Sequence, residues 1–191
     1  MQTSSEFESD VLDLIKSRRS RRAFSERPIE LERIKSLFEA ARWAPSSLNE
    51  QPWRYIYATK GQELWQKIFD ALNEGNKSWA KDAQLLIVSF CKKNFSRNGS
   101  ANGAAKYDVG AANAFLSLQA THLGLNTHQM GGFDHQLLRK NLNVPTDFEE
   151  GVVIAVGYAG DVDQLPSHLQ QRETSPRMRN VQDEFVMNRS F

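Results

Sequence analysis

With 191 residues, of which 40% are hydrophobic and 25% charged, the chain has the composition of one globular domain rather than of a disordered protein. The 24 basic and 23 acidic residues leave a formal net charge of +1, so no field of the whole molecule attracts nucleic acid or an anionic membrane. The one cysteine, Cys91, excludes disulfides within the chain, and its place at the end of the apolar run LLIVSFC predicts a buried, inert thiol.

The N-terminus, MQTSSEFESD, is polar and acidic, and it lacks the basic and apolar regions of a secretory signal. No apolar stretch approaches the roughly 18 residues of a membrane span. We therefore expect a cytoplasmic protein without a membrane partner.

Two amphipathic helices are expected in the first quarter of the chain. The first would be capped by Ser5, would end near a cluster of arginines, and would bury one apolar face: Phe7, Val11, Leu14 and Ile15. The second runs from about Glu30 to Trp43, with apolar residues at helical spacing, and Pro45 stops it.

Strand patterns follow. WRYIYA, residues 53–58, has the aromatic and β-branched content of a strand. A helix is then expected to begin at Gly61 and to end at Gly75. QLLIVSF, residues 84–90, is continuously apolar, which predicts a central strand buried on both faces.

Residues 95–103, FSRNGSANG, predict a surface loop. Residues 104–123 predict a long helix, whose many small residues favour a place in the core or at a subunit interface. Asp134 is expected to cap a further helix, and GVVIAVGY, residues 151–158, predicts a second buried strand.

The chain has no internal repeat, low-complexity tract or linker, so these elements predict a single α+β domain over residues 1–191. The tail of about 161–191 has little core pattern. It predicts an arm that needs another surface, such as a partner subunit, to pack on.

Motifs of several common chemistries are absent. There is no G-x-G-x-x-G after a strand, no G-x-x-x-x-G-K-[ST] loop and no G-x-S-x-G elbow. The four histidines do not form H-E-x-x-H, so no metal site is expected, and His122 is interpreted as a core residue rather than a base. We expect any chemistry to belong to a bound cofactor.

The segment KSRRSRR gathers four arginines around Ser20: Arg18, Arg19, Arg21 and Arg22. An isolated basic heptamer would favour a solvated basic face, but this one lies between two predicted helices. Arginine forks match phosphate oxygens bidentately, and a compact dianion fits such a cluster. Near the other end of the chain, PRMR places Arg177 and Arg179 on one side of an extended segment. The two clusters therefore predict one shared anion.

Four segments together resemble the FMN-dependent nitroreductase family: RRSRRAF (18–24), APSSLNEQPW (44–53), GGFD (131–134) and RMR (177–179). Their order and spacing also match, and the resemblance covers nearly the whole chain. It implies a three-layer α-β-α sandwich with a mostly antiparallel central sheet, and an obligate homodimer. The cofactor implied is FMN, with NAD(P)H as co-substrate.

The resemblance also assigns site residues. The FMN phosphate and ribityl chain would be held from both ends of the chain, by Arg18, Arg19, Ser20, Arg177 and Arg179. Arg22 would lie near the pyrimidine edge of the ring, where its charge stabilises the anionic reduced flavin, and Asn76 would bond that edge. The PSSLN loop of the second subunit would cover the flavin with Pro45, Ser46, Ser47 and Asn49.

The segment QMGG would lie against the flavin N5, which assigns Met130, Gly131 and Gly132, with the Gly131 backbone N–H as the N5 donor. On local grounds the two glycines also fit a simple tight turn before Asp134, and that alternative stays open. The sequence departs from the family at two positions. Trp79 stands where some members carry a lysine, and Gly131 stands where other members carry an acidic residue.

The function implied is hydride transfer from NAD(P)H by a ping-pong mechanism, with reduction of nitroaromatics, quinones or similar electron-poor acceptors. No side chain would act as an essential acid or base. Two alternatives remain open: an FMN-dependent dehydrogenase or flavin-modifying enzyme with one dedicated metabolite, and, more remotely, a basic-patch module for nucleic acid. The acceptor and the choice between NADH and NADPH also stay open.

Overall fold

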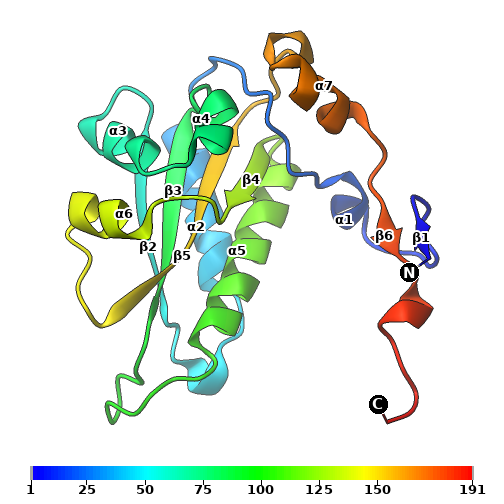
Figure 1. Cartoon of the computed structure of the whole chain (residues 1–191). Coiled ribbons are helices and arrows are strands. Elements are labelled where there is room, and N and C mark those ends of the chain that lie inside the picture. Colours follow the sequence, from blue (N-terminus) through cyan, green and yellow to red (C-terminus); the bar gives the residue numbers. More distant parts are fainter. Residues whose placement is uncertain (1, 191) are drawn as a thin grey trace.

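A four-stranded antiparallel sheet forms the centre of the structure, a computed structural model that describes residues 2–190 (Figure 1). In spatial order its strands are β2 (Trp53–Thr59), β3 (Leu85–Lys92), β5 (Phe148–Gly157) and β4 (Asn126–Met130). Met1 and Phe191, the ends of the predicted domain, lie outside the described residues. β4 is an edge strand of this sheet, and the candidate site lies along it.

Strand β3 is buried on both faces, as its sequence predicts. Leu86 and Val88 pack into the core on one side of the sheet, whereas Leu85 and Ile87 pack into the core on the other. Successive side chains of a strand point to opposite faces, so a strand between two layers of helices must be apolar throughout. All four side chains are fully buried, and each contributes about 1.5–3 kcal/mol of hydrophobic stabilisation.

Helices cover both faces of the sheet and give it three layers. One face carries α2 (Leu31–Arg42) and α5 (Ala105–His122), and the other carries α3 (Glu63–Asp70), α4 (Glu74–Ala80) and α6 (His135–Leu142). The predicted α+β class and α-β-α sandwich are therefore confirmed. Asp134 caps α6 as predicted, since its side chain accepts a hydrogen bond of 2.9 Å from the Leu137 N–H.

Helix α5 buries one side and exposes another that is also apolar. Val109, Ala112 and Leu116 face the sheet, whereas Tyr107 and Phe115 are 81% and 40% exposed. A helix with apolar character on more than its core face has a second surface to cover.

The two ends of the chain meet outside the sheet. β1 (Thr3–Ser4) pairs antiparallel with β6 (Arg179–Asn180), and α1 (Asp13–Ser17) lies near this pair, to the right in Figure 1. α7 (Ser167–Thr174) lies above them, at the top of the figure. Short 3-10 turns occur at Ser47–Asn49, Val162–Gln164 and Gln182–Glu184. The arm thus rests in part on the N-terminal segment of its own chain.

The prediction of a first helix capped by Ser5 is wrong. Residues 3–4 form β1 instead, and within the described residues 2–17 the five-residue α1 is the only helix. Phe7 and Ile15 are 50% and 43% exposed, so their helical spacing does not mark a core face in this chain. Periodicity predicts a buried face only where another element covers it.

Two further expectations are corrected. Gly75 does not end a helix: α3 ends at Asp70, and Asn73 caps α4 by accepting a hydrogen bond of 2.9 Å from the Asn76 N–H. The strong N-cap residue, rather than the glycine, sets this boundary. His122 is exposed at the end of α5 and is no core residue.

Cys91 is buried as predicted, and burial together with Glu149 raises the pKa of its thiol. Across residues 2–190, no helix combines the length and the apolar character that crossing a bilayer requires.

Candidate functional site

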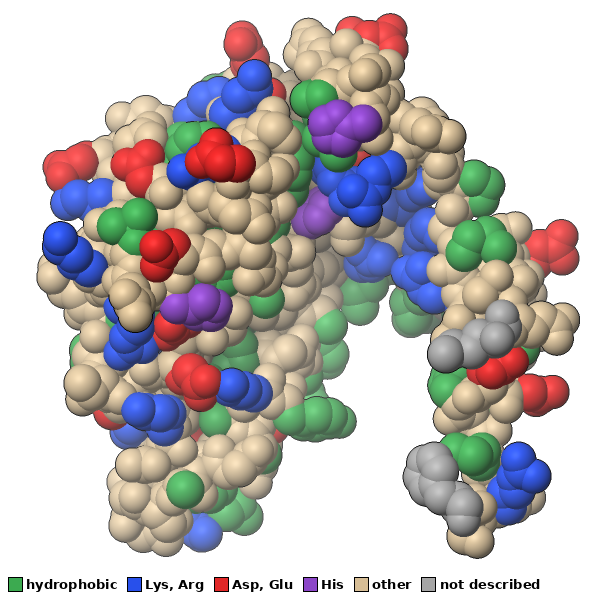
Figure 2. Space-filling view, viewed as in Figure 1, with side chains coloured by type: hydrophobic (Ala, Val, Ile, Leu, Met, Phe, Trp, Pro, Cys, Tyr) green, Lys and Arg blue, Asp and Glu red, His purple; other side chains and the backbone are tan. Residues whose placement is uncertain are grey.

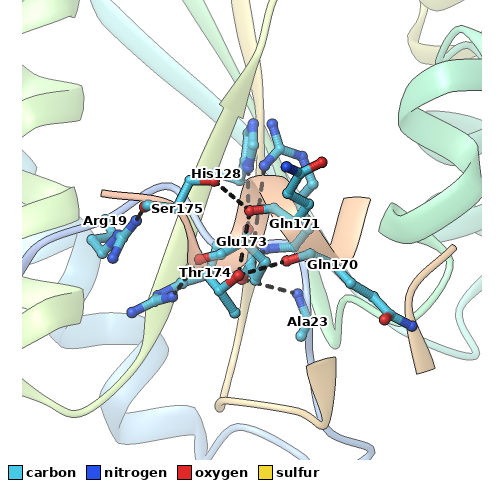
Figure 3. Close-up of polar contacts among 10 residues, drawn as sticks. Arg19, Ala23, His128, Gln170, Gln171, Glu173, Thr174 and Ser175 are labelled. Atoms are coloured by element: carbon cyan, nitrogen blue, oxygen red, sulfur yellow. Dashed lines mark hydrogen bonds and ion pairs between the residues drawn. The ribbon is translucent and has the colours of Figure 1, made fainter. Parts of the chain in front are cut away.

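The arginine segment, residues 18–24, is an extended stretch that lies between strand β4 and helix α7 (Figure 3). On the β4 side, Ser20 forms a parallel bridge with Thr127, and the ring of His128 bonds the Arg21 carbonyl through Nδ1 at 3.1 Å. On the α7 side, the Arg22 N–H donates to Glu173 Oε1 at 3.0 Å. The segment is therefore fixed from both sides rather than solvated as a free basic arm.

Two of its arginines hold α7 in place. Arg19 Nη2 donates to the Ser175 carbonyl at 2.5 Å, and Arg21 Nη1 donates to the Glu173 carbonyl at 3.0 Å. These carbonyls lie in the last turn of α7 or just after it, where backbone acceptors lack helical partners. Arg19, predicted to hold a phosphate, thus has at least one of its donors committed to the fold.

Arg18, Arg177 and Arg179 line one hollow of about 440 Å³, here named the terminal hollow because residues from both chain ends form it. Burial and the charge of Arg179 lower the pKa of Arg18, and burial and the charge of Arg18 lower that of Arg177. Figure 2 shows Lys and Arg side chains gathered on the inner side of the terminal elements, where they face the main body of the molecule. The arrangement concentrates positive charge at one place.

Arg177 and Arg18 play different parts in this hollow. Arg177 Nη1 donates to the Arg18 carbonyl at 2.6 Å, and its Nη2 donates to the Lys16 carbonyl at 2.5 Å. Arg177 therefore binds the carbonyls at the end of α1 and fixes the backbone that carries Arg18. Acidic residues also reach this hollow: Glu8 lines it, and its carboxylate accepts from the Gln182 N–H at 2.8 Å.

A second hollow of about 270 Å³, here named the strand hollow, adjoins the arginine segment. Besides Ile15, Arg18 and Ser20, it is lined from α5 by Ala114, Ser117 and Leu118 and from β4 by Thr127 and Gln129. Gln129 Nε2 donates to Ser117 Oγ at 3.2 Å, which closes its floor with polar groups. Sequence reasoning missed these two residues, although Gln129 stands beside the assigned Met130 and Ser117 belongs to the small-residue pattern of α5.

The end of β4 brings Asn76 to Gly132. The Gly132 carbonyl accepts from Asn76 Nδ2 at 2.9 Å and from the Asn73 N–H at 3.1 Å, while Met130 is buried in the core. A Cβ on Gly132 would lie 2.2 Å from Asn73 Nδ2, whereas a Cβ on Gly131 would meet no described atom within 4 Å. Gly132 is thus required by its neighbours, and the space beside the exposed Gly131 is open.

Arg22 lies over an aromatic cluster. Its guanidinium carbon is 6.0 Å from the centroid of the buried Trp79 ring, which in turn lies 4.5 Å from the His128 ring. Burial and the charges of Arg22 and Arg172 lower the pKa of His128 to about 4. His128 is therefore neutral at pH 7, and its bond to the Arg21 carbonyl places the proton on Nδ1.

The PSSLN loop lies away from the arginine segment and from both hollows of its own chain. The Ser47 N–H donates to the buried Asp108 at 3.1 Å, near the start of α5, while Ser117 of the strand hollow lies nine residues, about 13 Å, further along that helix. Leu48 and Asn49 have φ values of 53° and 55°, a left-handed conformation that a bulky residue such as leucine adopts at a cost. Pro45, Ser46, Ser47 and Asn49 line neither hollow of their own chain.

Comparisons with known proteins show related sequences and a closely similar fold. The model of the nitroreductase family matches residues 15–78 and 66–158. A solved structure of an oxidoreductase containing FMN is 33% identical, with a TM-score of 0.92, and the match covers 100% of this chain and 98% of that one.

Two curated proteins are also similar. A protein of Archaeoglobus fulgidus, named provisionally as an NADH dehydrogenase or NAD(P)H nitroreductase, is 28% identical over 163 residues, which is 80% of this chain and 87% of that protein. The nitrobenzene nitroreductase of Ectopseudomonas oleovorans is 44% identical over 52 residues, 27% of this chain and 23% of that protein. Since the family model matches well over half of the sequence, the chain belongs to the nitroreductase family.

Proposed function

We propose that this chain is an FMN-dependent oxidoreductase that takes hydride from NAD(P)H. The observation that carries the proposal is the meeting of Arg18, Arg177 and Arg179, from opposite ends of the sequence, at the terminal hollow. Within the described residues, no carboxylate is among the charges that shift the pKa of Arg18 or Arg177. Among the described residues that line the hollow, the three guanidinium groups outnumber the two carboxylates, Glu6 and Glu8, so positive charge is left over for a phosphate group.

The residues present fit the cofactor. Arg18, Ser20 and Arg179 would hold the FMN phosphate and ribityl chain, Arg177 would fix the backbone of Arg18, and Arg22 would lie at the pyrimidine edge. The open space beside Gly131 leaves room for the ring to approach the backbone. When bound, FMN supplies the hydride chemistry, and the chain supplies orientation and positive charge.

The acceptor belongs to the same proposal: an electron-poor nitroaromatic or a quinone that occupies the place vacated by the nicotinamide, in a ping-pong sequence. Two features support it. The residues around the strand hollow include no acid–base pair that a dedicated proton transfer would need. The short, 44% identical match to a nitrobenzene nitroreductase points to the same substrate class.

A homodimer completes the site in this proposal. The PSSLN loop is remote from both hollows of its own chain, so Pro45, Ser46, Ser47 and Asn49 would reach the flavin of a second copy. The single domain over residues 1–191 would extend its arm, about 161–191, onto that copy. Phe185 and Val186 of the arm are 62% and 59% exposed, which leaves apolar surface for the partner to cover.

The visible absorption spectrum of the purified protein tests the function. We expect a yellow protein with a flavin spectrum that bleaches under anaerobic NADH or NADPH and returns when a nitroaromatic or quinone is added. Initial rates at several acceptor concentrations should give parallel double-reciprocal lines, as a ping-pong mechanism requires. A colourless protein that added FMN cannot reconstitute contradicts the proposal; intersecting lines contradict only the ping-pong part.

A further inference from the structure

A buried carboxylate, Glu173, contacts the arginine segment. It belongs to helix α7, and its side chain is only 2% exposed. Carboxylates are rarely buried this completely unless they are paired or hydrogen-bonded. Glu173 and Arg22 are 151 positions apart in the sequence, so the fold, and not local sequence, brings them together.

Hydrogen-bond donors of the arginine segment surround the oxygens of Glu173 (Figure 3). Oε1 accepts from the Arg22 N–H at 3.0 Å and is 3.5 Å from the Ala23 nitrogen, and Oε2 lies 3.8 Å from Arg22 Nη1. The backbone carbonyl of Glu173 accepts from Arg21 Nη1 at 3.0 Å. A group that meets only donors is matched by an ionised carboxylate, which can only accept. Glu173 thus touches both the backbone and the guanidinium of Arg22.

The charge of Glu173 bears directly on Arg22. The Arg22 side chain is 18% exposed, and burial followed by the charge of Arg172 lowers its pKa, while Glu173 acts in the opposite direction. His128, which also faces Arg22, is neutral at pH 7. Among the groups recorded as acting on Arg22, Glu173 is the one negative charge.

We infer that Glu173 is a positioning residue that sets the reduction potential of the bound flavin through Arg22. It fixes the Arg22 backbone and offsets part of the Arg22 charge, so the positive field that stabilises an anionic reduced flavin is weaker than Arg22 alone would give. The carboxylate therefore lowers the potential. This inference rests on the proposed function, because it needs FMN beside Arg22.

The test is the midpoint potential of bound FMN in four holoproteins: wild type, Glu173→Gln, Arg22→Gln and the double variant. The Arg22–Glu173 pair is neutral in the wild type and in the double variant, positive in Glu173→Gln and negative in Arg22→Gln. We expect the midpoint potential to rise with the charge of the pair. It should be lowest in Arg22→Gln, highest in Glu173→Gln, and intermediate and similar in the wild type and the double variant. In Glu173→Gln the affinity for reduced relative to oxidised FMN should rise threefold to tenfold, which for a two-electron couple is about 15–30 mV.

Glu150→Gln is the matched control. Glu150 is also a mostly buried carboxylate, 8% exposed, and lies 2.7 Å from Arg139, but it contacts no residue of the arginine segment or of α7. We expect its potential to equal that of the wild type. An equal shift in Glu150→Gln would mean that any lost carboxylate has this effect, and the inference would be overturned.

Removing one member of a buried ion pair can unfold a protein, whereas removing both members is often nearly neutral. If Glu173→Gln does not fold, the step from Arg22→Gln to the double variant decides, because it deletes the same carboxylate and should raise the potential. If neither single variant folds, the wild type and the double variant decide: equal potentials are expected, and a clearly lower potential in the double variant would mean that the carboxylate does not offset Arg22. A wild type without FMN would overturn the proposed function itself. If the wild type binds FMN and Glu173→Gln has the same midpoint potential as the wild type, only the role of Glu173 is overturned.

Discussion

At the scale of single residues, the arginines of this site divide their tasks. Arg19, Arg21 and Arg177 donate to backbone carbonyls and hold the chain ends together, whereas no hydrogen bond or ion pair is recorded for the Arg18 side chain within residues 2–190. A guanidinium group whose donors remain free, and which burial and Arg179 make costly to keep charged, gains most from an anion. Arg18 is therefore the residue on which phosphate binding depends most directly.

Replacing Arg18 by Ala should weaken FMN binding by about 10- to 150-fold, because a charge-assisted hydrogen bond contributes about 1.5–3 kcal/mol. Flavin fluorescence titration of the apoprotein measures the affinity, and far-ultraviolet circular dichroism should show unchanged helices. Arg42→Ala, which removes an exposed guanidinium paired with Glu39 on α2, is the control and should bind FMN like the wild type. Wild-type affinity in Arg18→Ala contradicts the phosphate assignment.

His128 makes the folded state sensitive to acid. Its folded pKa of about 4 lies below the ordinary 6.5, so the unfolded chain takes up a proton as the pH falls through this window while the folded chain does not. Stability is therefore complete above about pH 6.5 and is lost as the pH falls toward 4. Between pH 7 and pH 5 we expect a loss of about 2 kcal/mol from this group.

Urea unfolding of the wild type and of His128→Asn at both pH values measures this contribution. Asparagine keeps an N–H near the position of Nδ1 but does not titrate, so the variant should lose about 2 kcal/mol less than the wild type between the two pH values. His168→Asn, at an exposed position of α7, should behave like the wild type. Equal pH dependence in wild type and His128→Asn would exclude His128 as the cause.

At the scale of elements, sequence patterns succeeded where an element packs on the core. The strand at 84–90 and the helices at 30–43 and 104–123 differ from β3, α2 and α5 by only one or two residues at most ends, because apolar periodicity reports burial. The helix expected from Ser5 failed because its apolar residues do not meet a core: Phe7, Val11 and Ile15 line the terminal hollow, and Leu14 lines another surface hollow. The site shows the same limit: composition and motif indicate Arg18 and Arg179, whereas nothing local marks Glu173 as a partner of Arg22.

The turn between β4 and α6 makes a sharp contrast between two adjacent glycines. In the protein without FMN, Gly132→Ala places a Cβ 2.2 Å from Asn73 Nδ2 and should cost about 1–3 kcal/mol, as overpacking does, whereas Gly131→Ala meets open space and should change stability by less than about 0.5 kcal/mol. Urea unfolding measures both. In an Asn73→Ala background the cost of Gly132→Ala should fall by about half, because the clashing side chain is gone. Equal costs for the two glycines would contradict this account of the turn.

At the scale of the whole molecule, the proposed homodimer would complete the site and cover an exposed apolar surface. The PSSLN loop lies away from the arginine segment of its own chain, and a hollow of about 420 Å³, here named the helix hollow, is lined by Leu14, Trp43 and Phe115. Trp43 is 69% exposed, which is unusual for so large an apolar side chain. In the proposed homodimer a second copy covers this hollow and brings its PSSLN loop to the flavin, so we expect dimer formation and cofactor binding to be lost together.

Sedimentation should therefore report about twice the chain mass of 21.7 kDa for the wild type. Phe115→Glu places a charge in the helix hollow, whose burial against a partner would cost several kcal/mol, and should shift the protein toward the single-chain mass. FMN affinity should fall in parallel, since the loop of the partner would leave the site. Leu31→Glu is the control, because Leu31 is exposed like Phe115 and lies in the first turn of α2, where an acidic residue suits the helix dipole. It should change neither the sedimenting mass nor the FMN affinity. A wild type that sediments as a single chain and still binds FMN tightly would show that one copy completes the site alone.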